Sequence, residues 1–404
     1  MMIRNSRQYW LQVIGVGFII ATSIYVLTGE IANNLRSSMG ITSASQLLHR
    51  PSPRPHEPTG DSAGNSTLGF DTVYFINMAT RYDRLDAASL QAYLSGIDIT
   101  LSSGVSPDMM HDVGMPPTHT PGLLGDGQKG CWRAHANIWS KMLRENTKAA
   151  LIIEADASWD TNLREIMLNL NRNFTEFLRS TDSQSLPKPR LRSQSQKTQN
   201  EPLDLNDEDP WHSDHWDIIS IGQCSEETLN SDINMIYDDP HVPPGMDYYG
   251  RILGRERVIR KAGHQGCTTG YAVSLNGAAK LLLRFAADLD QAVDMGMSSL
   301  VQSGHLTSYS VYPPILAQWV YVDGISMDQR GSNSDMGGTE GSSIGSESDP
   351  NAVDWEDVRK AGSVWAPKKW PSNAAFEEMA LQSAWQQIFG GADPYTGLTT
   401  TYSW

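Results

Sequence analysis

One short segment, residues 149–160, constrains the fold more than any other part of the chain. Its sequence is AALIIEADASWD, in which the aliphatic run indicates a buried strand. The run stops at two acids, Glu154 and Asp156, and a polar turn follows. Acids at the carboxyl end of a strand in an α/β fold lie where such sheets bind ligands. The segment predicts a sheet edge that holds a divalent cation, or the ribose and diphosphate of a nucleotide. The alternative is that both acids only cap the next helix.

Strand-like and helix-like segments alternate on both sides of this run. Runs rich in aliphatic, aromatic and β-branched residues predict strands at 70–78, 97–104, 149–154 and 215–224. Helical spacing of apolar residues predicts helices at 87–96, 129–146, 161–178 and 276–285. This alternation predicts an α/β domain with a mostly parallel sheet flanked by helices.

The amino-terminal part differs from the rest of the chain. Residues 9–27 form an apolar run long enough to span a bilayer as a helix, and Arg4 and Arg7 precede it. We expect residues 1–8 to be a cytoplasmic tail, 9–27 a signal anchor and 28–67 a disordered stem. A cleaved signal peptide is the alternative to the anchor.

Beyond the stem, residues 68–404 are long enough for one large domain. Two polar stretches interrupt it, 180–210 and 331–350, and we expect both to be flexible insertions. The net charge of −15 excludes non-specific binding of nucleic acid, because phosphate backbones are bound by basic surfaces.

Three cysteines are too few for a disulfide scaffold. In an oxidising compartment one pair can form, and we expect it to be Cys224 with Cys267; three buried thiols are the alternative. Two glycosylation sequons, 65–67 and 173–175, agree with a lumenal domain.

Several segments in order along residues 68–336 resemble glycosyltransferase family 25, in particular its fungal branch of membrane proteins. The matching segments are TLGFDTVYFINMATRYDRLDA, GCWRAHANIWSKML, AALIIEADASWD, WDIISIGQC, GCTTGYAVSLNGAAKLL and VYPPILAQW. Each match alone is weak, and their common order makes the resemblance specific.

The resemblance implies a GT-A-like, Rossmann-like domain behind the amino-terminal transmembrane helix. It implies an inverting transferase that takes a sugar, most often galactose from UDP-galactose, to a glycan or glycoprotein acceptor in the secretory pathway. A type II anchor with a stem is typical of fungal Golgi enzymes of this kind. The alternative is a catalytically inactive lectin-like or scaffold protein on the same fold.

The resemblance also implies which residues contact the donor. The positions that match are Asn77, Arg81, Arg84, His135, Glu154 and Tyr271. The guanidinium groups of Arg81 and Arg84 suit a diphosphate, because they donate paired hydrogen bonds to its oxygens. The alternative is that these arginines pair with Asp83 and Asp86 on the surface.

Asp156 is the candidate catalytic residue, as a ligand of Mn²⁺ or another divalent cation or as a contact to the ribose-phosphate of the donor. Where the family pattern has two adjacent aspartates, this chain has Ala155 and Asp156, so one carboxylate of the metal site is missing. An inverting transfer also needs a base for the acceptor hydroxyl, for which we expect Asp217. Four further acids are candidates for the base: Glu226, Glu227, Asp232 and Asp335.

Overall fold

The computed structural model describes residues 62–181, 209–322, 354–368 and 375–390. The predicted tail and anchor, nearly all of the stem and the insertions fall outside these ranges. No helix within the described ranges has the length and apolar character needed to cross a membrane. The anchor at residues 9–27 therefore stays a prediction.

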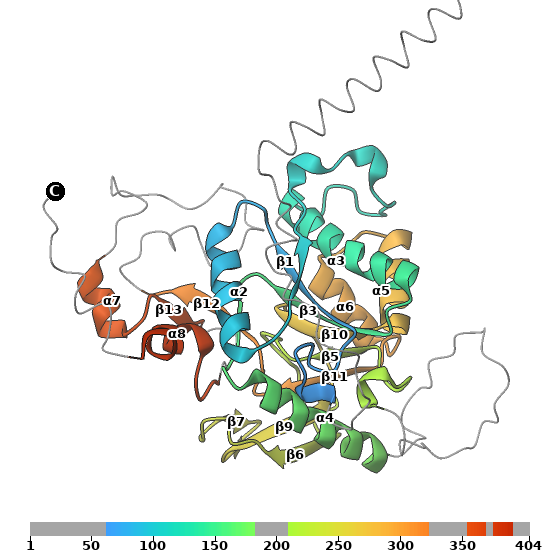
Figure 1. The fold of residues 1–404 in the computed structure, drawn as a ribbon. Coiled ribbons are helices and arrows are strands. Elements are labelled where there is room, and N and C mark those ends of the chain that lie inside the picture. Colours follow the sequence, from blue (N-terminus) through green and yellow to red (C-terminus); the bar gives the residue numbers. More distant parts are fainter. Residues whose placement is uncertain (1–61, 182–208, 323–353, 369–374, 391–404) are drawn as a thin grey trace, which may run out of the picture. The chain divides into compact units, whose positions relative to one another are not determined.

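An eight-stranded sheet forms the centre of the described domain (Figure 1). Its strand order is β2-β1-β3-β10-β5-β11-β9-β6. The strands are β1 Thr72–Asn77, β2 Thr100–Ser103, β3 Ala149–Glu154, β5 Ile218–Ser220, β6 Asn234–Asp238, β9 Glu256–Lys261, β10 Gly270–Ser274 and β11 Ser308–Tyr312.

The sheet is mostly parallel, as predicted. The pairs β1·β2, β1·β3 and β5·β11 are parallel. Strand β10 is antiparallel to both β3 and β5, and β9 is antiparallel to both β11 and β6. Six of the eight strands therefore share one direction, and β10 and β9 run the other way. The reversal brings the start of β10 to the edge where β3 ends, because Gly270 pairs with Ile153.

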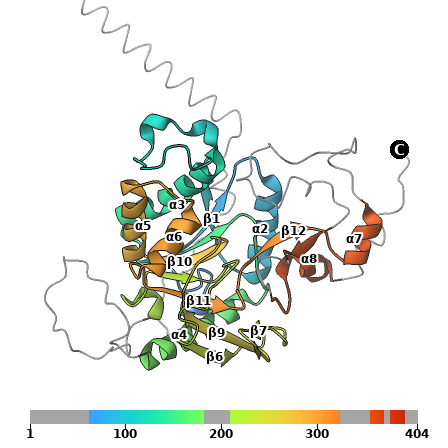
Figure 2. The same ribbon diagram turned by 180° about the vertical axis from the view of Figure 1, so that it is seen from behind.

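Each face of the sheet is covered by helices with an apolar side. Helices α3 (Asp126–Glu145), α5 (Leu275–Ala287) and α6 (Val293–Gln302) pack on one face and lie grouped together in Figure 2. Helices α2 (Tyr82–Ser95) and α4 (Leu163–Ser180) pack on the other. Along β3 the side chains alternate between these two cores, as the period of a strand requires.

Helix α2 begins earlier than the sequence predicts. The sequence predicts a helix from residue 87, but the helix starts at Tyr82. Asp83 lies in the first turn, where a negative charge favours the helix dipole. Arg84 turns inward and is buried, so polar character alone did not mark a loop. The helix ends as predicted at Gly96, whose φ of +64° suits glycine.

A smaller sheet of three strands lies beside the carboxyl edge of the main sheet. Its order is β13-β12-β4, with β4 Ala157–Ser158, β12 Ala317–Tyr321 and β13 Trp365–Pro367. Two further helices follow in the tail, α7 Trp355–Ala361 and α8 Ala380–Phe389. A short hairpin, β7 (Asp247–Tyr248) and β8 (Arg251–Ile252), completes the strands.

The predicted disulfide is confirmed. Cys224, after β5, is bonded to Cys267, before β10, with their Cα atoms 5.5 Å apart. Cys131 in α3 is a free cysteine. The bond ties together two loops that reach the same edge of the sheet.

Candidate functional site

Polar side chains gather where β1 and β3 end and β10 begins. Asn77 is the last residue of β1, and Glu154 is the last residue of β3. The Glu154 amide donates to the carbonyl oxygen of Thr269, just before β10 (3.0 Å). This edge is where open α/β sheets bind ligands.

Glu154 is held by a chain of hydrogen bonds that starts in the core. The indole nitrogen of Trp139 donates to the Tyr271 hydroxyl (3.1 Å), and the same hydroxyl is hydrogen-bonded to Nδ1 of His135 (2.9 Å). His135 Nε2 donates to Glu154 Oε1 (3.2 Å). The Thr268 hydroxyl donates to the same oxygen (2.7 Å). The Glu154 carboxylate is thereby fixed in orientation.

These bonds also set the charge of Glu154. Burial raises the pKa of its carboxyl, but the hydrogen bonds from His135 and Thr268 and the charge of Arg84 outweigh burial and lower the pKa. The side chain keeps 22 % of its surface exposed. Glu154 is therefore an ionised carboxylate that a ligand can reach.

Asp156 lies two residues further on and is buried, with 5 % of its surface exposed. Its Oδ2 accepts from the side chain of Gln318 (3.1 Å) and lies 3.9 Å from Nη2 of Arg84. Its Oδ1 has no hydrogen-bond partner. Burial raises the pKa of Asp156 to about 6; Arg84 opposes this rise, and the charge of Glu154 adds to it.

The two arginines after β1 take different positions. Arg81 forms a paired interaction with Asp83, through Nε (2.9 Å) and Nη2 (2.8 Å), as the surface alternative anticipated. Arg84 instead points inward, toward Asp156. Asn77 donates to the carbonyl oxygens of Met78 (2.9 Å) and Arg81 (3.3 Å), while its own Oδ1 is buried without a partner.

The oxygen atoms at this edge suit a hard divalent cation, because such a cation prefers oxygen ligands. The orphaned Oδ1 of Asp156 and the partly exposed Glu154 are the two carboxylates available. Ala155 lies between them, but its side chain packs in the core with Ile153 on the face opposite Glu154. A carboxylate at position 155 would therefore point away from this edge.

A second set of potential ligands is Cys131, His135 and Glu154, whose ligand atoms lie within 4.8 Å of one another. Both ring nitrogens of His135 already form the hydrogen bonds described above. Two of the three residues, His135 and Glu154, are therefore already engaged in that hydrogen-bond chain.

Asp217 is not brought to this site. It comes just before β5 and is fully buried, at the level of Ala149 at the opposite end of the sheet. Its carboxylate accepts from Lys280 (2.5 Å), Asn276 (2.7 Å) and the amide of Thr307 (2.8 Å). The structure gives Asp217 a place in anchoring α5 and no place beside Asp156.

The other four candidate bases differ in their exposure and location. Glu227 and Asp232 are exposed, and Asp335 lies outside the described residues. Glu226 is partly buried and lines a cavity of about 260 Å³ beside the ends of β5 and β11. Among the described candidates, Glu226 is the one acid that both lines a cavity and lies near this edge.

Sequence reasoning missed three residues near Asp156 and Glu154. Gln318 of β12 bonds to Asp156, and Lys368 donates to Gln318 (3.0 Å) and lowers the pKa of Asp156 through its charge. Both come from segments more than 150 residues away, so no local pattern marks them. Thr268 had one available signal, its position next to Cys267.

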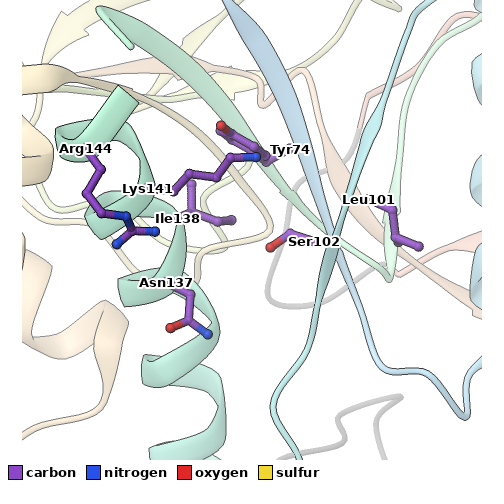
Figure 3. Close-up of a pocket in the computed structure, with 7 residues that line it drawn as sticks. All are labelled: Tyr74, Leu101, Ser102, Asn137, Ile138, Lys141 and Arg144. Carbon is purple, nitrogen blue, oxygen red and sulfur yellow. The ribbon is translucent and has the colours of Figure 1, made fainter. Parts of the chain in front are cut away.

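A second cavity, of about 250 Å³, lies apart from this site, between α3 and the strands β1 and β2. Figure 3 shows Lys141 of α3 extending toward Tyr74 of β1, and its ammonium lies 5.1 Å from the ring centre. None of the residues that line it belongs to the site built above.

A family model described as glycosyltransferase family 25 (LPS biosynthesis protein) matches residues 70–297. Procollagen galactosyltransferase 1 of Danio rerio is 23 % identical over 226 residues, which cover 53 % of this chain and 29 % of that protein. Procollagen galactosyltransferase 1-B of Xenopus laevis is 25 % identical over 227 residues, 53 % of this chain and 28 % of that protein.

A third relative, inactive glycosyltransferase 25 family member 3 of Homo sapiens, is 28 % identical over 132 residues, 30 % of this chain and 20 % of that protein. The chain thus matches less than a third of the length of these relatives. A solved structure, A197 from STIV, aligns with a TM-score of 0.28 at 10 % identity, over 62 % of this chain and 86 % of that one.

The family match runs from β1 into α6 and includes Asn77, Arg84, His135, Glu154, Asp156 and Tyr271, whereas Gln318 and Lys368 lie beyond it. The resemblance seen in the sequence is confirmed over this region, and the chain belongs to glycosyltransferase family 25.

Proposed function

We propose that this protein is an inverting glycosyltransferase that moves a sugar from a nucleotide-sugar donor to a glycan or glycoprotein acceptor. Galactose from UDP-galactose is the donor we propose, because two of the relatives are named procollagen galactosyltransferases. The observation that carries the proposal is the pair Glu154 and Asp156 at the carboxyl edge of the sheet, with Arg84 beside Asp156.

Charge and hydrogen bonding at this edge suit a nucleotide diphosphate. The buried oxygens left without partners, Asn77 Oδ1 and Asp156 Oδ1, offer acceptors for ribose hydroxyls or ligands for a cation. A bound divalent cation, held by Glu154 and Asp156, would offset the negative charge of the diphosphate. Arg84 neutralises part of the carboxylate charge, and the bond from His135 fixes Glu154.

The proposed reaction is a single displacement. The oxygen of an acceptor hydroxyl forms a bond to the anomeric carbon, and the bond from that carbon to the diphosphate oxygen breaks, with its electron pair leaving on the diphosphate. The hydroxyl proton passes to a base. Attack on the side opposite the leaving group inverts the anomeric carbon.

We also propose that the domain lies in the lumen of the Golgi or another secretory compartment, behind a single-pass type II anchor at residues 9–27. The apolar run with basic residues before it and the two sequons support this placement. The Cys224–Cys267 bond adds to it, because structural disulfides persist in oxidising compartments.

An inactive scaffold on the same fold is the second candidate function. Two observations favour it: a relative is named an inactive member of the family, and Ala155 replaces a family aspartate. The carboxylates of Glu154 and Asp156 support activity, because Ala155 faces the core and takes no part at the edge.

The test is thermal unfolding of the protein with UDP-galactose, UDP-glucose and GDP-mannose, each with and without Mn²⁺. A ligand that binds the folded state raises the unfolding midpoint, so a donor at one hundred times its Kd adds about 2.7 kcal/mol. We expect UDP-galactose to raise the midpoint and to be hydrolysed slowly without acceptor. Stabilisation without turnover would favour the scaffold, and no stabilisation by any donor would refute the proposal.

A further inference from the structure

The cavity beside Glu226 is lined by acidic, polar and tyrosine side chains. It measures about 260 Å³, smaller than the roughly 300–1,000 Å³ of sites for drug-sized ligands, so it suits one small ring. It lies between the ends of β5 and β11 and the β7–β8 hairpin. Its walls are Gln223, Cys224, Ser225, Glu226, Asp247, Tyr248, Tyr249, Arg260, Ser310, Tyr312 and Pro314.

Two short connections join this cavity to the carboxylates at the sheet edge, one through a covalent bond and one through close packing of the backbone. Cys224 in its wall is bonded to Cys267, and the next residue, Thr268, donates to Glu154. Gly222 packs so closely on Gly270 that a Cβ there would lie 2.6 Å from the Gly270 amide nitrogen. The cavity is therefore a direct neighbour of the proposed donor site.

Three residues in the wall carry a buried oxygen without a hydrogen-bond partner. These atoms are Gln223 Oε1, Glu226 Oε2 and Ser310 Oγ. Gln223 is 4 % exposed and Ser310 1 %. Gln223 is anchored through its other side, because its amide nitrogen donates to the Val311 carbonyl oxygen (2.8 Å). Buried polar atoms normally have partners, so an array of three in one cavity wall indicates a ligand that supplies donors.

The charge of the cavity excludes an anion. Glu226 and Asp247 are acidic, and Arg260 is the one basic residue in the wall. The Arg260 guanidinium is already occupied: it donates to the Tyr249 hydroxyl (2.6 Å) and to the carbonyl oxygens of Glu227 (2.8 Å) and Leu229 (2.6 Å). A diphosphate would meet two carboxylates here and no available cation.

Aromatic rings complete the wall. The ring centres of Tyr248 and Tyr249 are 4.8 Å apart, and those of Tyr248 and Tyr312 are 5.6 Å apart. Tyrosine offers large apolar faces at little cost in conformational entropy. Ring faces beside hydrogen-bond acceptors match a pyranose, which has an apolar C–H face and hydroxyl donors around its rim.

We propose that this cavity binds a neutral pyranose ring and is the acceptor subsite of the transferase. The assignment as acceptor subsite rests on the proposed function. Gln223, Glu226 and Ser310 accept or exchange hydrogen bonds with the ring hydroxyls, and the tyrosines contact its C–H face. One hydroxyl of the ring is then directed toward the neighbouring donor site at Glu154.

The test uses saturation-transfer NMR on the full chain with three probes: methyl β-D-galactopyranoside, methyl β-D-glucopyranoside and methyl α-D-mannopyranoside. We expect one glycoside to bind, and Ser310→Ala and Gln223→Leu each to weaken it about tenfold, the effect of losing one buried hydrogen bond. Ser102→Ala, in the separate cavity of Figure 3, is the matched control and should leave binding unchanged.

The same variants also provide a control for misfolding. Ser310→Ala removes a hydroxyl that has no partner in the free protein, so its unfolding midpoint should equal or exceed that of the parent. Loss of glycoside binding in a variant of undiminished stability then supports a contact. Absence of binding by all three glycosides, or binding that both variants retain, overturns the proposal.

Different experimental results would refute the acceptor subsite and the proposed transferase function. Glycoside binding is measured without nucleotide sugar, and hydrolysis of UDP-galactose without acceptor. If hydrolysis occurs and the acceptor KM is the same in parent and Ser310→Ala, the subsite is wrong and the transferase stands. If a glycoside binds at Ser310 but no nucleotide sugar binds, the transferase is wrong and the acceptor assignment falls with it.

Discussion

Glu154 and Asp156 are two residues apart at the end of one strand, and their carboxyl groups are shifted in opposite directions. Hydrogen bonds from His135 and Thr268 outweigh burial and lower the pKa of Glu154, whereas burial raises the pKa of Asp156 to about 6. Neighbouring acids whose environments separate their pKa values are typical of functional sites. Near pH 6, Glu154 is ionised and Asp156 is half protonated.

The raised pKa of Asp156 predicts how Asp156→Asn behaves. Because the folded pKa of about 6 exceeds the ordinary 3.8, ionising Asp156 destabilises the fold, and stability falls as pH rises from about 4 to 6. Asp156→Asn should therefore be more stable than the parent at pH 7.5 by roughly 1–3 kcal/mol, with no difference below pH 4.

Urea unfolding at pH 4, 5, 6 and 7.5 measures this difference. The same variant should lose the stabilisation by UDP-galactose and Mn²⁺ that we expect of the parent. A variant that gains no stability at pH 7.5 would show that Arg84 fully compensates the buried charge.

Ala155→Asp would restore the family's second aspartate, and we expect it to destabilise the protein without improving metal binding. The side chain at 155 is 6 % exposed and packs in the core, so a carboxyl group there loses its hydration. The expected loss is about 2–3 kcal/mol or more. Ala155→Ser, which adds one small polar group, is the matched control and should lose less. Unchanged stability with tighter Mn²⁺ binding would mean that this position does reach the edge.

Tyr271→Phe should destabilise the protein by about 1–3 kcal/mol, because it leaves the buried Nδ1 of His135 and the indole nitrogen of Trp139 without partners. Tyr309→Phe is a close control: its hydroxyl is also buried but has no partner, so its removal should cost nothing. Equal losses in both variants, measured by urea unfolding, would refute the hydrogen-bond chain. A transferase should also lose turnover in Tyr271→Phe, because Glu154 is then less firmly held.

The double variant Cys224→Ala, Cys267→Ala should lose about 4 kcal/mol, the loop-entropy value for a bond that closes 43 residues. Denaturant unfolding against the oxidised parent measures the loss. Cys131→Ala, at the free cysteine, should change stability by less than about 1 kcal/mol. A double variant as stable as this control would show that the bond contributes nothing to the fold.

His212 provides a pH test away from the site. Hydrogen bonds to Asp209 and Asp71 raise its pKa from 6.5 to about 9, so its stabilising effect is complete below pH 6.5 and lost as pH rises through 9. His212→Gln should cost about 0.5–1 kcal/mol at pH 6.5, a modest value because a third of the side chain is exposed. The cost should vanish near pH 10. A cost that does not change with pH would indicate packing and not charge.

Local patterns predicted four strands of the central sheet, β1, β2, β3 and β5, and four helices, α2, α3, α4 and α5. The aliphatic run of β3 and the helical spacing in α3 carry their own signals, and the ordered segments identified the family. Three features escaped prediction because they depend on contacts between distant segments. Arg84, expected to contact the donor, is buried against Asp156, Gln318 comes from β12, and Asp217 lies at the opposite end of the sheet.

Because strand β10 is reversed, the protein should tolerate inserted residues less well before β10 than on the far side of the sheet. The first residues of β10, with Thr268 and Cys267 before them, bring a hydroxyl and a covalent bond to Glu154 and the neighbouring cavity. One residue inserted before Gly270 would shift both, whereas one inserted beyond the end of α5 would leave them in place. Length variation between related chains should accordingly be rare in residues 264–269 and common on the far side of the sheet.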